Sequence, residues 1–378
     1  MKILLNLLAA KQGGQVTRAK EFIGRFQSFA NKNDKLLVLT SNFFPTRIKN
    51  NRSIKVVKIN FSIKSIDWLV RYIWENLKLI NLIKNLKPDV YLTFSHSLPL
   101  LKLNIPTMVG VSNLAPFSYS AFIKETIFGK MRLFFLKRMI ISATNKASAV
   151  IALSNEGKKF LINHGIENKK IIKILIGVKT QKKRLLNNSF NLKEKYILYV
   201  SHFYRYKNFE QLILAYSKLP KNTISKFRLK LVGNFADKRY VQSLQQISKK
   251  MNIYDKIDFI SGMNSKSLDL MYKNASLFVF PSKIENCPNI LLEAMSFSLP
   301  ILAGKTPPMP EFSKKAANFF EIDNPQDLSK KINKLLKSKK KLNKMSKLSY
   351  ARSKIYSWDL FTKNVIDICK ITIKKNYK

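Results

Sequence analysis

The chain has 378 residues, a length that predicts two domains of about 150–200 residues each. Hydrophobic residues make up 46% of it and aromatic residues 11%, which is enough for packed interiors and excludes extensive disorder. Two cysteines and three scattered histidines exclude a disulfide framework, a four-cysteine zinc site and a histidine-rich metal centre. We therefore expect a cytoplasmic globular protein.

The charge balance is strongly basic, with 69 lysine and arginine residues against 22 acidic residues and a formal net charge of +47. One explanation is attraction to a polyanion, either nucleic acid or an anionic membrane surface. The other is compositional drift, because the excess is nearly all lysine and is accompanied by abundant Asn and Ile. The lysines are spread along the whole chain, so they indicate no specific partner by themselves.

Short apolar runs alternate with amphipathic stretches from one end of the chain to the other. The first run, Ile3–Ala10, is too short to span a membrane and has no cleavage site, so we expect a buried strand there. The strands predicted in the first half are Ile3–Leu8, Lys35–Thr40, Ile54–Ile59, Val90–Phe94, Thr107–Val111 and Ala149–Leu153. Those predicted in the second half are Tyr196–Val200, Lys230–Val232, Ile257–Ile260, Leu277–Phe280 and Ile301–Leu302.

The helices predicted between these strands include Thr17–Ala30, Trp68–Leu86, Phe209–Lys218, Val241–Met251 and Ser265–Lys273. Strands that alternate with helices predict βαβ crossovers and parallel sheets. A polar, basic stretch without periodicity at 179–195 predicts a linker between two Rossmann-like domains, 1–178 and 196–356. We expect residues 357–378 to form a helix that crosses back to the first domain.

The most informative segment is the strand Leu277–Phe280 and the helix that follows it. Pro288 suits a first helical position, with Asn286 or Cys287 as the cap. A helix that begins at the carboxyl end of a parallel strand offers free backbone N–H groups, which bind phosphates. Glu285 and Glu293 would lie on either side of that phosphate site and accept hydrogen bonds from sugar hydroxyls. The alternative is two exposed glutamates at a helix start, where acids are favoured anyway.

The spacing Glu285-x7-Glu293, followed by Ala294-Met295, resembles the E-x7-E signature of retaining GT-B glycosyltransferases of family 4 (glycosyl transferases group 1). The resemblance covers nearly the whole chain. Further segments that carry it are Gly13-Gly14-Gln15, Val150–Gly157, Gly165-Ile166, Ile176–Val178, Ile197–Asn208, Leu231–Gly233, Phe259–Gly262, Pro310-Glu311 and Trp358.

The resemblance implies an α/β GT-B fold, in which two Rossmann-like domains with parallel sheets face a central cleft. The C-terminal half would bind a UDP- or GDP-linked sugar, and the N-terminal half a glycan or lipid-linked acceptor. The reaction would be hexosyl transfer with retention at the anomeric carbon. Glu285 would orient the donor sugar and Glu293 would hold the ribose, while Lys207 and the helix start near Asn289 would stabilise the leaving diphosphate.

The basic pair departs from the family pattern. Lys207 keeps the lysine position, but His202 occupies the arginine position and Arg205 lies between them. A cation beside the diphosphate stabilises the charge that develops as the leaving group departs, so Lys207 is assigned to catalysis. The other residues expected at the donor are His202, Arg205, Asn286, Pro288, Asn289, Gly262 and Gly14.

On the acceptor side we expect Gly13, His96 and Asn113. Glycines allow the backbone to approach a phosphate or sugar, although Gly13 and Gly14 would also suit an ordinary tight turn. Family members often carry a histidine after the strand corresponding to Thr107–Val111, and this chain has Ser112 there, to which no role transfers. His96 would face the same cleft or serve as an ordinary loop residue.

The chain contains no D-x-D pair, so we expect no bridging divalent ion and no cofactor. The segment Ala121–Thr144 combines aromatic and aliphatic residues with a basic flank, which suits either an anionic membrane surface or a core-facing crossover helix. In the first case the enzyme would be peripheral at the inner face of the cytoplasmic membrane.

Two other functional classes stay open from the sequence. A GT-B epimerase or phosphorylase would share the architecture. A basic nucleic-acid-binding protein is suggested by the charge alone, but no recognised motif supports it and we expect no nucleic-acid partner.

Overall fold

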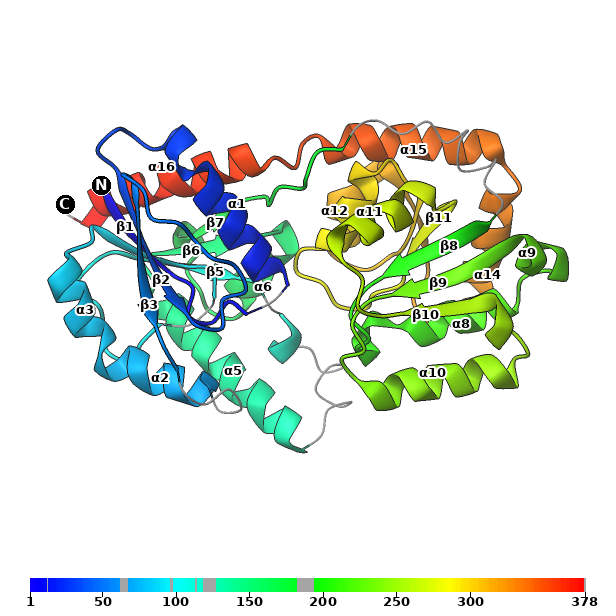
Figure 1. Ribbon diagram of the computed structural model, residues 1–378, viewed down its shortest axis with the longest axis horizontal. Helices are drawn as coiled ribbons and strands as arrows, with labels where there is room; N and C mark the ends of the chain where they lie inside the picture. Colours follow the sequence, from blue (N-terminus) through cyan, green and yellow to red (C-terminus); the bar gives the residue numbers. More distant parts are fainter. Residues whose placement is uncertain are drawn as a thin grey trace. The chain divides into compact units, whose positions relative to one another are not determined.

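The computed structural model describes residues 1–11, 13–61, 67–95, 98–112, 114–117, 127–181 and 194–376. The chain forms two compact units (Figure 1). Unit 1 comprises Met1–Phe117, Glu125–Gly177 and Ser357–Lys378, and unit 2 contains Val178–Tyr356. Each unit has its own parallel sheet.

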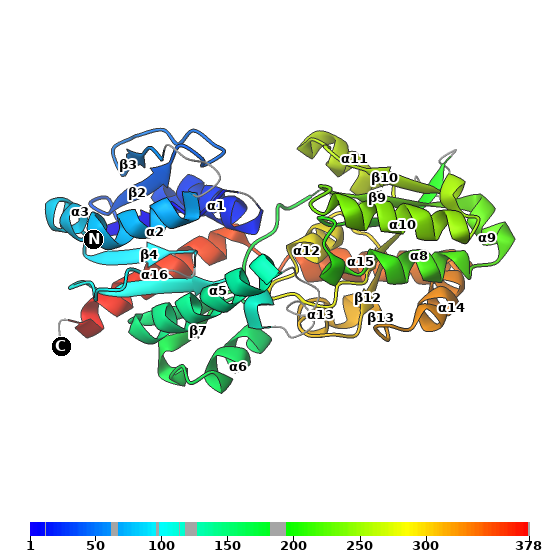
Figure 2. The same cartoon turned by 90° about the horizontal axis from the view of Figure 1, so that it is seen from below.

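Unit 1 is built on a seven-stranded sheet of order β3-β2-β1-β4-β5-β6-β7. Its strands are β1 (Lys2–Asn6), β2 (Lys35–Ser41), β3 (Ile54–Ile59), β4 (Val90–Thr93), β5 (Thr107–Val111), β6 (Ala149–Ala152) and β7 (Ile171–Lys173). Its helices are α1 (Gly14–Phe29), α2 (Asp67–Leu77), α3 (Leu79–Leu86), α5 (Ile127–Lys146), α6 (Asn155–Asn163) and α16 (Trp358–Asn376). Helices α1 and α16 cover one face of the sheet, and α2, α3 and α5 cover the other (Figures 1 and 2).

Unit 2 is built on a six-stranded sheet of order β10-β9-β8-β11-β12-β13. Its strands are β8 (Lys195–Val200), β9 (Phe227–Val232), β10 (Ile257–Ile260), β11 (Leu277–Phe280), β12 (Ile301–Gly304) and β13 (Ala317–Phe320). Its helices are α8 (Phe209–Ser217), α9 (Lys221–Lys226), α10 (Lys238–Lys250), α11 (Ser265–Asn274), α12 (Asn289–Ser296), α13 (Met309–Ser313), α14 (Pro325–Leu336) and α15 (Lys339–Ser353). Counted from β8, the order is 3-2-1-4-5-6, that of a Rossmann sheet.

Every predicted strand corresponds to an observed one, and all the pairings are parallel. The parallel α/β architecture follows from the continuous apolar runs of the central strands, which are buried on both faces. Two strands were missed, β7 and β13. Both are short edge strands, β7 of three residues and β13 of four, too short to show a clear pattern in the sequence.

The chain passes between the units at Gly177–Val178 and again at Tyr356–Ser357. Within unit 2 the Val178 amide donates to the Tyr356 carbonyl at 3.0 Å. Residues 182–193, most of the predicted linker, lie outside the described residues, and β8 begins at Lys195. Within unit 1, α16 returns to pack along α1.

Gly177 is a position where only glycine fits. A Cβ built there would lie 2.2 Å from the backbone nitrogen of Trp358, which is itself buried. We expect Gly177→Ala to lower the free energy of unfolding by about 2–4 kcal/mol because the backbone must shift. Gly24→Ala is the control, since a Cβ at this helical position meets nothing within 4 Å. It should stabilise by about 0.5–1 kcal/mol. Equal urea midpoints for the two variants would contradict this account.

Candidate active site

The order of strands in unit 2 reverses between β8 and β11, which are hydrogen-bonded neighbours. Their carboxyl ends lead into two loops, one after Val200 and one after Phe280, at the same edge of the sheet. In open parallel sheets, ligands bind at this edge where the strand order reverses. The candidate site is therefore built from these two loops and the start of α12.

Both catalytic residues predicted from the sequence meet in this place. The Lys207 ammonium lies 2.6 Å from Oε1 of Glu285, and their side chains are only 15% and 12% exposed. The two loops are also joined by the Lys283 amide, which donates to the Tyr206 carbonyl at 3.0 Å. Residues 78 positions apart in sequence thus form one half-buried ion pair at the reversal point.

The loop that carries Lys207 is held by its own side chains. The hydroxyl of Tyr199, a buried β8 residue, donates to the Lys207 carbonyl at 2.8 Å. Asn208 ends the short turn Arg205–Lys207 with φ of 60°, a conformation that asparagine tolerates. Tyr206 and Tyr204 stack at 5.6 Å between ring centroids, and the Lys207 ammonium lies 5.0 Å from the Tyr206 ring centre. These tyrosines received no role from the sequence.

Arg205 and His202 do not join the ion pair. Arg205 is exposed, lies over the Tyr240 ring at 5.1 Å and approaches Asp237 at 3.8 Å, so its contacts are with α10. Partial desolvation, and then the positive charge of Lys207, lower the pKa of His202. A lowered pKa favours the uncharged imidazole of His202, whose ring can exchange hydrogen bonds with a ligand.

The start of α12 differs by one residue from the prediction. Pro288 is the N-cap and Asn289 is the first helical residue, so Asn286 and Cys287 precede the cap instead of providing it. The Asn289 amide donates to the Cys287 carbonyl at 2.9 Å, which turns the chain into the helix one position later. The Asn289 Oδ1 atom is buried without a hydrogen-bond partner in the described structure. The N–H groups of Ile290 and Leu291, which follow Asn289 in the first turn of α12, are the ones that a helix start offers to an anion.

Glu293 lies half-buried in α12, one turn beyond this helix start. The Tyr272 hydroxyl donates to its Oε2 at 3.2 Å. Desolvation, assisted by the negative charge of Asp269 and opposed by the Tyr272 hydrogen bond, raises the pKa of Glu293 to about 7. No cation pairs with this carboxyl group in the described part of the chain. Such a group gains from a ligand that brings hydroxyl donors to it.

The predicted glycines differ in their surroundings. Gly262 follows β10, two strands away from β8, and has φ of 73° with open space around it. Gly13 is the N-cap of α1 with φ of 68°, and Gly14 is the first residue of that helix, both in unit 1. Gly233, to which no role was given, allows the loop after β9 to approach the loop after β8, because a Cβ there would lie 1.8 Å from the Ser201 carbonyl oxygen.

His96 and Asn113, predicted at the acceptor side, lie outside the described residues. Ser112 accepts a hydrogen bond from the Gln15 amide at 3.2 Å, so the first turn of α1 and the loop after β5 meet in unit 1. Within the described residues, no group of three or more His, Cys, Asp or Glu side chains could hold a metal ion. None of the helices described is long and apolar enough to cross a membrane.

Comparison with protein families matches residues 181–352, which include the ion pair and α12. The matching family is glycosyl transferases group 1. An uncharacterized glycosyltransferase of Haemophilus influenzae is 30% identical over 173 residues, 45% of this chain and 47% of that relative. The O-antigen chain mannosyltransferase RfbU of Salmonella typhimurium is 26% identical over 69% of this chain and 68% of its own. The chain spans about half the length of the first of these relatives.

Solved structures match over nearly the whole chain. Anabaena HepE in complex with UDP and glucose has a TM-score of 0.71 at 16% identity, covering 97% of this chain and 98% of that one. WaaG, a glycosyltransferase involved in lipopolysaccharide biosynthesis, has a TM-score of 0.74 at 15% identity, covering 97% and 99%. These matches confirm the predicted α/β GT-B fold class.

Proposed function

We propose that the protein is a retaining glycosyltransferase of family 4 that moves a sugar from a UDP- or GDP-linked donor to a glycan or lipid-linked acceptor. The observation that carries this proposal is the half-buried Lys207–Glu285 ion pair at the point where the strand order of unit 2 reverses. The family match over residues 181–352 supports glycosyl transfer over epimerisation or phosphorolysis. The names of the relatives favour a role in cell-surface polysaccharide biosynthesis.

In this proposal, Lys207 changes partner when the donor binds. The diphosphate takes the ammonium group, and Glu285 is released to accept hydrogen bonds from the donor sugar. Lys207 and the first N–H groups of α12 then stabilise the charge on the leaving nucleoside diphosphate. Glu293 accepts hydrogen bonds from the ribose hydroxyls, which offsets its costly burial. His202, Arg205, Asn286, Pro288, Asn289, Gly262 and Gly14 stay assigned to the donor, and Gly13, His96 and Asn113 to the acceptor.

The donor is identified by incubating the protein with a panel of UDP- and GDP-linked sugars, with and without acceptor saccharides. Mannose belongs in the panel because RfbU is named a mannosyltransferase. Nucleoside diphosphate released only when an acceptor is present, with an unchanged anomeric configuration in the product, is the expected result. Rapid release of nucleoside diphosphate without an acceptor, or conversion of the donor into an isomer, would contradict glycosyl transfer to an acceptor.

We also propose that catalysis needs no metal ion or cofactor, because cations and a helix start are available to the diphosphate. Transfer should persist at more than about half its rate in excess EDTA, since Lys207 and α12 supply the positive potential. The control is EDTA titrated with an equal amount of Ca²⁺. Complete loss that Mn²⁺ or Mg²⁺ restores would overturn this part of the proposal.

We propose further that the protein works at the anionic inner face of the cytoplasmic membrane on a lipid-linked acceptor. The net charge of +47 supports attraction to such a surface. The membrane contact was predicted at Ala121–Thr144. Residues 121–126 of this segment lie outside the described residues, and residues 127–144 belong to helix α5.

A further inference from the structure

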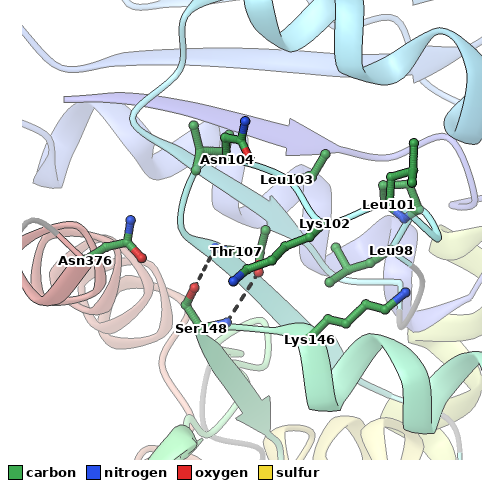
Figure 3. A pocket seen from close by; sticks show the side chains of 11 residues that line it. Leu98, Leu101, Lys102, Leu103, Asn104, Thr107, Lys146, Ser148 and Asn376 are labelled. Atoms are coloured by element: carbon green, nitrogen blue, oxygen red, sulfur yellow. Dashed lines mark hydrogen bonds between the residues drawn. The ribbon is translucent and has the colours of Figure 1, made fainter.

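A cavity of about 350 Å³ lies in unit 1 at the amino ends of β5 and β6 (Figure 3). Thr107 is the first residue of β5, and Ser148 directly precedes β6. The loops of unit 1 that were expected to contact substrates follow the carboxyl ends of the strands, so this cavity lies at the other edge of the sheet. Its volume falls within the range of small-ligand sites, about 300–1,000 Å³.

Two hydroxyl groups that line the cavity have protons to donate. The Thr107 amide donates to the Ser148 hydroxyl oxygen at 3.1 Å, and the Ser148 amide donates to the Thr107 hydroxyl oxygen at 3.3 Å. Both hydroxyl oxygens are therefore acceptors, and neither hydroxyl has an acceptor for its own proton among the described residues. Because Thr107 is only 5% exposed, an acceptor for its proton has to enter the cavity.

Three longer side chains add further donors and acceptors. Lys102 extends across the cavity toward Ser148, and Asn376 faces it from α16 (Figure 3). Asn104 lines the same space. Within the ranges that the structure describes, none of these three side chains makes a hydrogen bond or an ion pair, so all of them are available to a ligand.

The rest of the lining is largely apolar. Leu103 is 8% exposed, Ile105 is half-buried, and Leu98 packs against the core of unit 1. A pyranose ring carries CH groups on its faces and hydroxyl groups around its edge. Apolar side chains therefore suit the faces of such a ring. Hydroxyl, amide and ammonium groups suit its edge, because a sugar hydroxyl both donates and accepts hydrogen bonds.

The same lining is poorly suited to a phosphate or a metal ion. Lys146, the second lysine of the lining, already donates to the Leu100 carbonyl at 2.6 Å. The backbone amides of Thr107 and Ser148 also have acceptors, so they form no free pair of N–H groups of the kind that binds phosphate. No acidic residue lines the cavity, and carboxylates are the ligands that divalent cations prefer.

We propose that this cavity is a second saccharide site, distinct from the candidate active site of unit 2, and that it binds one pyranose ring. Thr107 and Ser148 donate their hydroxyl protons to the ring, and Lys102 donates to another of its oxygens. The two asparagine amides exchange hydrogen bonds with its hydroxyl groups, while the leucines face its CH groups. This inference deepens the proposed function and rests on it, because an enzyme that extends a glycan meets the same saccharide chemistry in its substrate.

The test measures saccharide binding to the full chain by saturation-transfer NMR. The probes are the methyl α-glycosides of mannose, glucose and galactose, and α-linked trisaccharides of the same sugars. The wild type should bind at least one methyl glycoside with a Kd of about 1 mM, which is typical of a ligand of this size. A trisaccharide that binds at least about fivefold more tightly identifies a glycan chain as the source of the ring, and equal affinity identifies a free sugar. A wild type that binds none of these probes would overturn the proposal.

Two matched double variants locate the binding. Asn104→Ala/Asn376→Ala removes two exposed amides that line the cavity, and Asn163→Ala/Asn168→Ala removes two exposed amides of unit 1 outside it. The first variant should bind saccharide about tenfold more weakly, the loss expected for two hydrogen bonds. The second should stay within about twofold of the wild type, and both should keep its urea midpoint, because these side chains are exposed. Equal saccharide binding by both variants would place the ligand elsewhere and overturn the proposal.

Lys102→Gln separates a saccharide from an anion. Glutamine still donates a hydrogen bond, so saccharide affinity should fall less than about threefold. Excess inorganic phosphate should not displace the methyl glycoside from the wild type. Displacement by phosphate, with loss of glycoside binding in Lys102→Gln, would assign the cavity to an anion and overturn the proposal.

Titration of the same variants with UDP and GDP keeps this proposal apart from the proposed function. Nucleotide affinity should be unchanged, because the cavity belongs to unit 1 and the Lys207–Glu285 pair to unit 2. Nucleotide binding without any saccharide binding at the cavity would overturn the second site alone. Saccharide binding that Asn104→Ala/Asn376→Ala weakens, in a protein without nucleotide affinity, would instead count against the proposed glycosyl transfer.

Discussion

Lys207→Ala should lower the turnover number of sugar transfer by about 10²–10³-fold, the loss typical of one preorganised electrostatic contact to a developing charge. The ammonium is half-buried beside Glu285, so it acts where solvent screening is weak. Glu285→Gln should lower turnover similarly, because an amide still fits the space but accepts hydrogen bonds from sugar hydroxyls less strongly.

The matched control is Lys283→Ala. Lys283 lies in the same loop as Glu285, but its ammonium pairs with Asp323 at 2.5 Å and not with Glu285. We expect less than about a threefold change in turnover, because a surface ion pair contributes little. Thermal unfolding of all three variants separates catalysis from stability. Equal losses of turnover in Lys207→Ala and Lys283→Ala would contradict a specific role of Lys207, because any nearby positive charge would then have the same effect.

Glu293→Gln should stabilise the unliganded protein at pH 8 and weaken donor binding. Burial raises the pKa of Glu293 from 4.5 to about 7, so between these values the folded state holds a proton that the unfolded state has lost. Wild-type stability therefore falls as pH rises from 5 to 8. The variant does not titrate and should gain about 1–3 kcal/mol over the wild type at pH 8, and little at pH 5.

The same variant should lose about 1–3 kcal/mol of UDP- or GDP-sugar affinity, because the charged acceptor for the ribose hydroxyls is gone. Wild-type affinity should rise from pH 6 to pH 8 as Glu293 ionises, and that of the variant should not. Glu210→Gln, at an exposed position in α8, is the control and should show no pH-dependent difference in urea unfolding. A Glu293→Gln protein that is less stable than wild type at pH 8 would contradict the raised pKa.

The parallel sheets could be predicted because continuous apolar strands and amphipathic helices alternate along the chain. The resemblance to family 4 assigned Glu285 and Lys207 to one donor site, and the structure brings them together because both follow strands whose carboxyl ends share one edge. Spacing could not predict the direction in which Arg205 turns, since that depends on Asp237 and Tyr240 of α10.

The raised pKa of Glu293 could not be predicted from the sequence either, because it depends on how the helices pack. A glutamate one turn inside a helix is ordinarily solvated, and only the packing of α12 against Tyr272 removes water from it. Likewise, Gly233 could be matched to a pattern but not explained, because the Ser201 carbonyl that excludes a side chain lies on another strand's loop.

The most direct test of the account is a crystal structure of the protein with bound UDP or GDP. The account predicts a phosphate oxygen within about 3 Å of the Lys207 ammonium, a typical charged hydrogen bond. It also predicts that the first N–H groups of α12 face the same phosphate and that Glu285 has left Lys207. A nucleotide bound elsewhere, with the 2.6 Å Lys207–Glu285 pair intact, would contradict it.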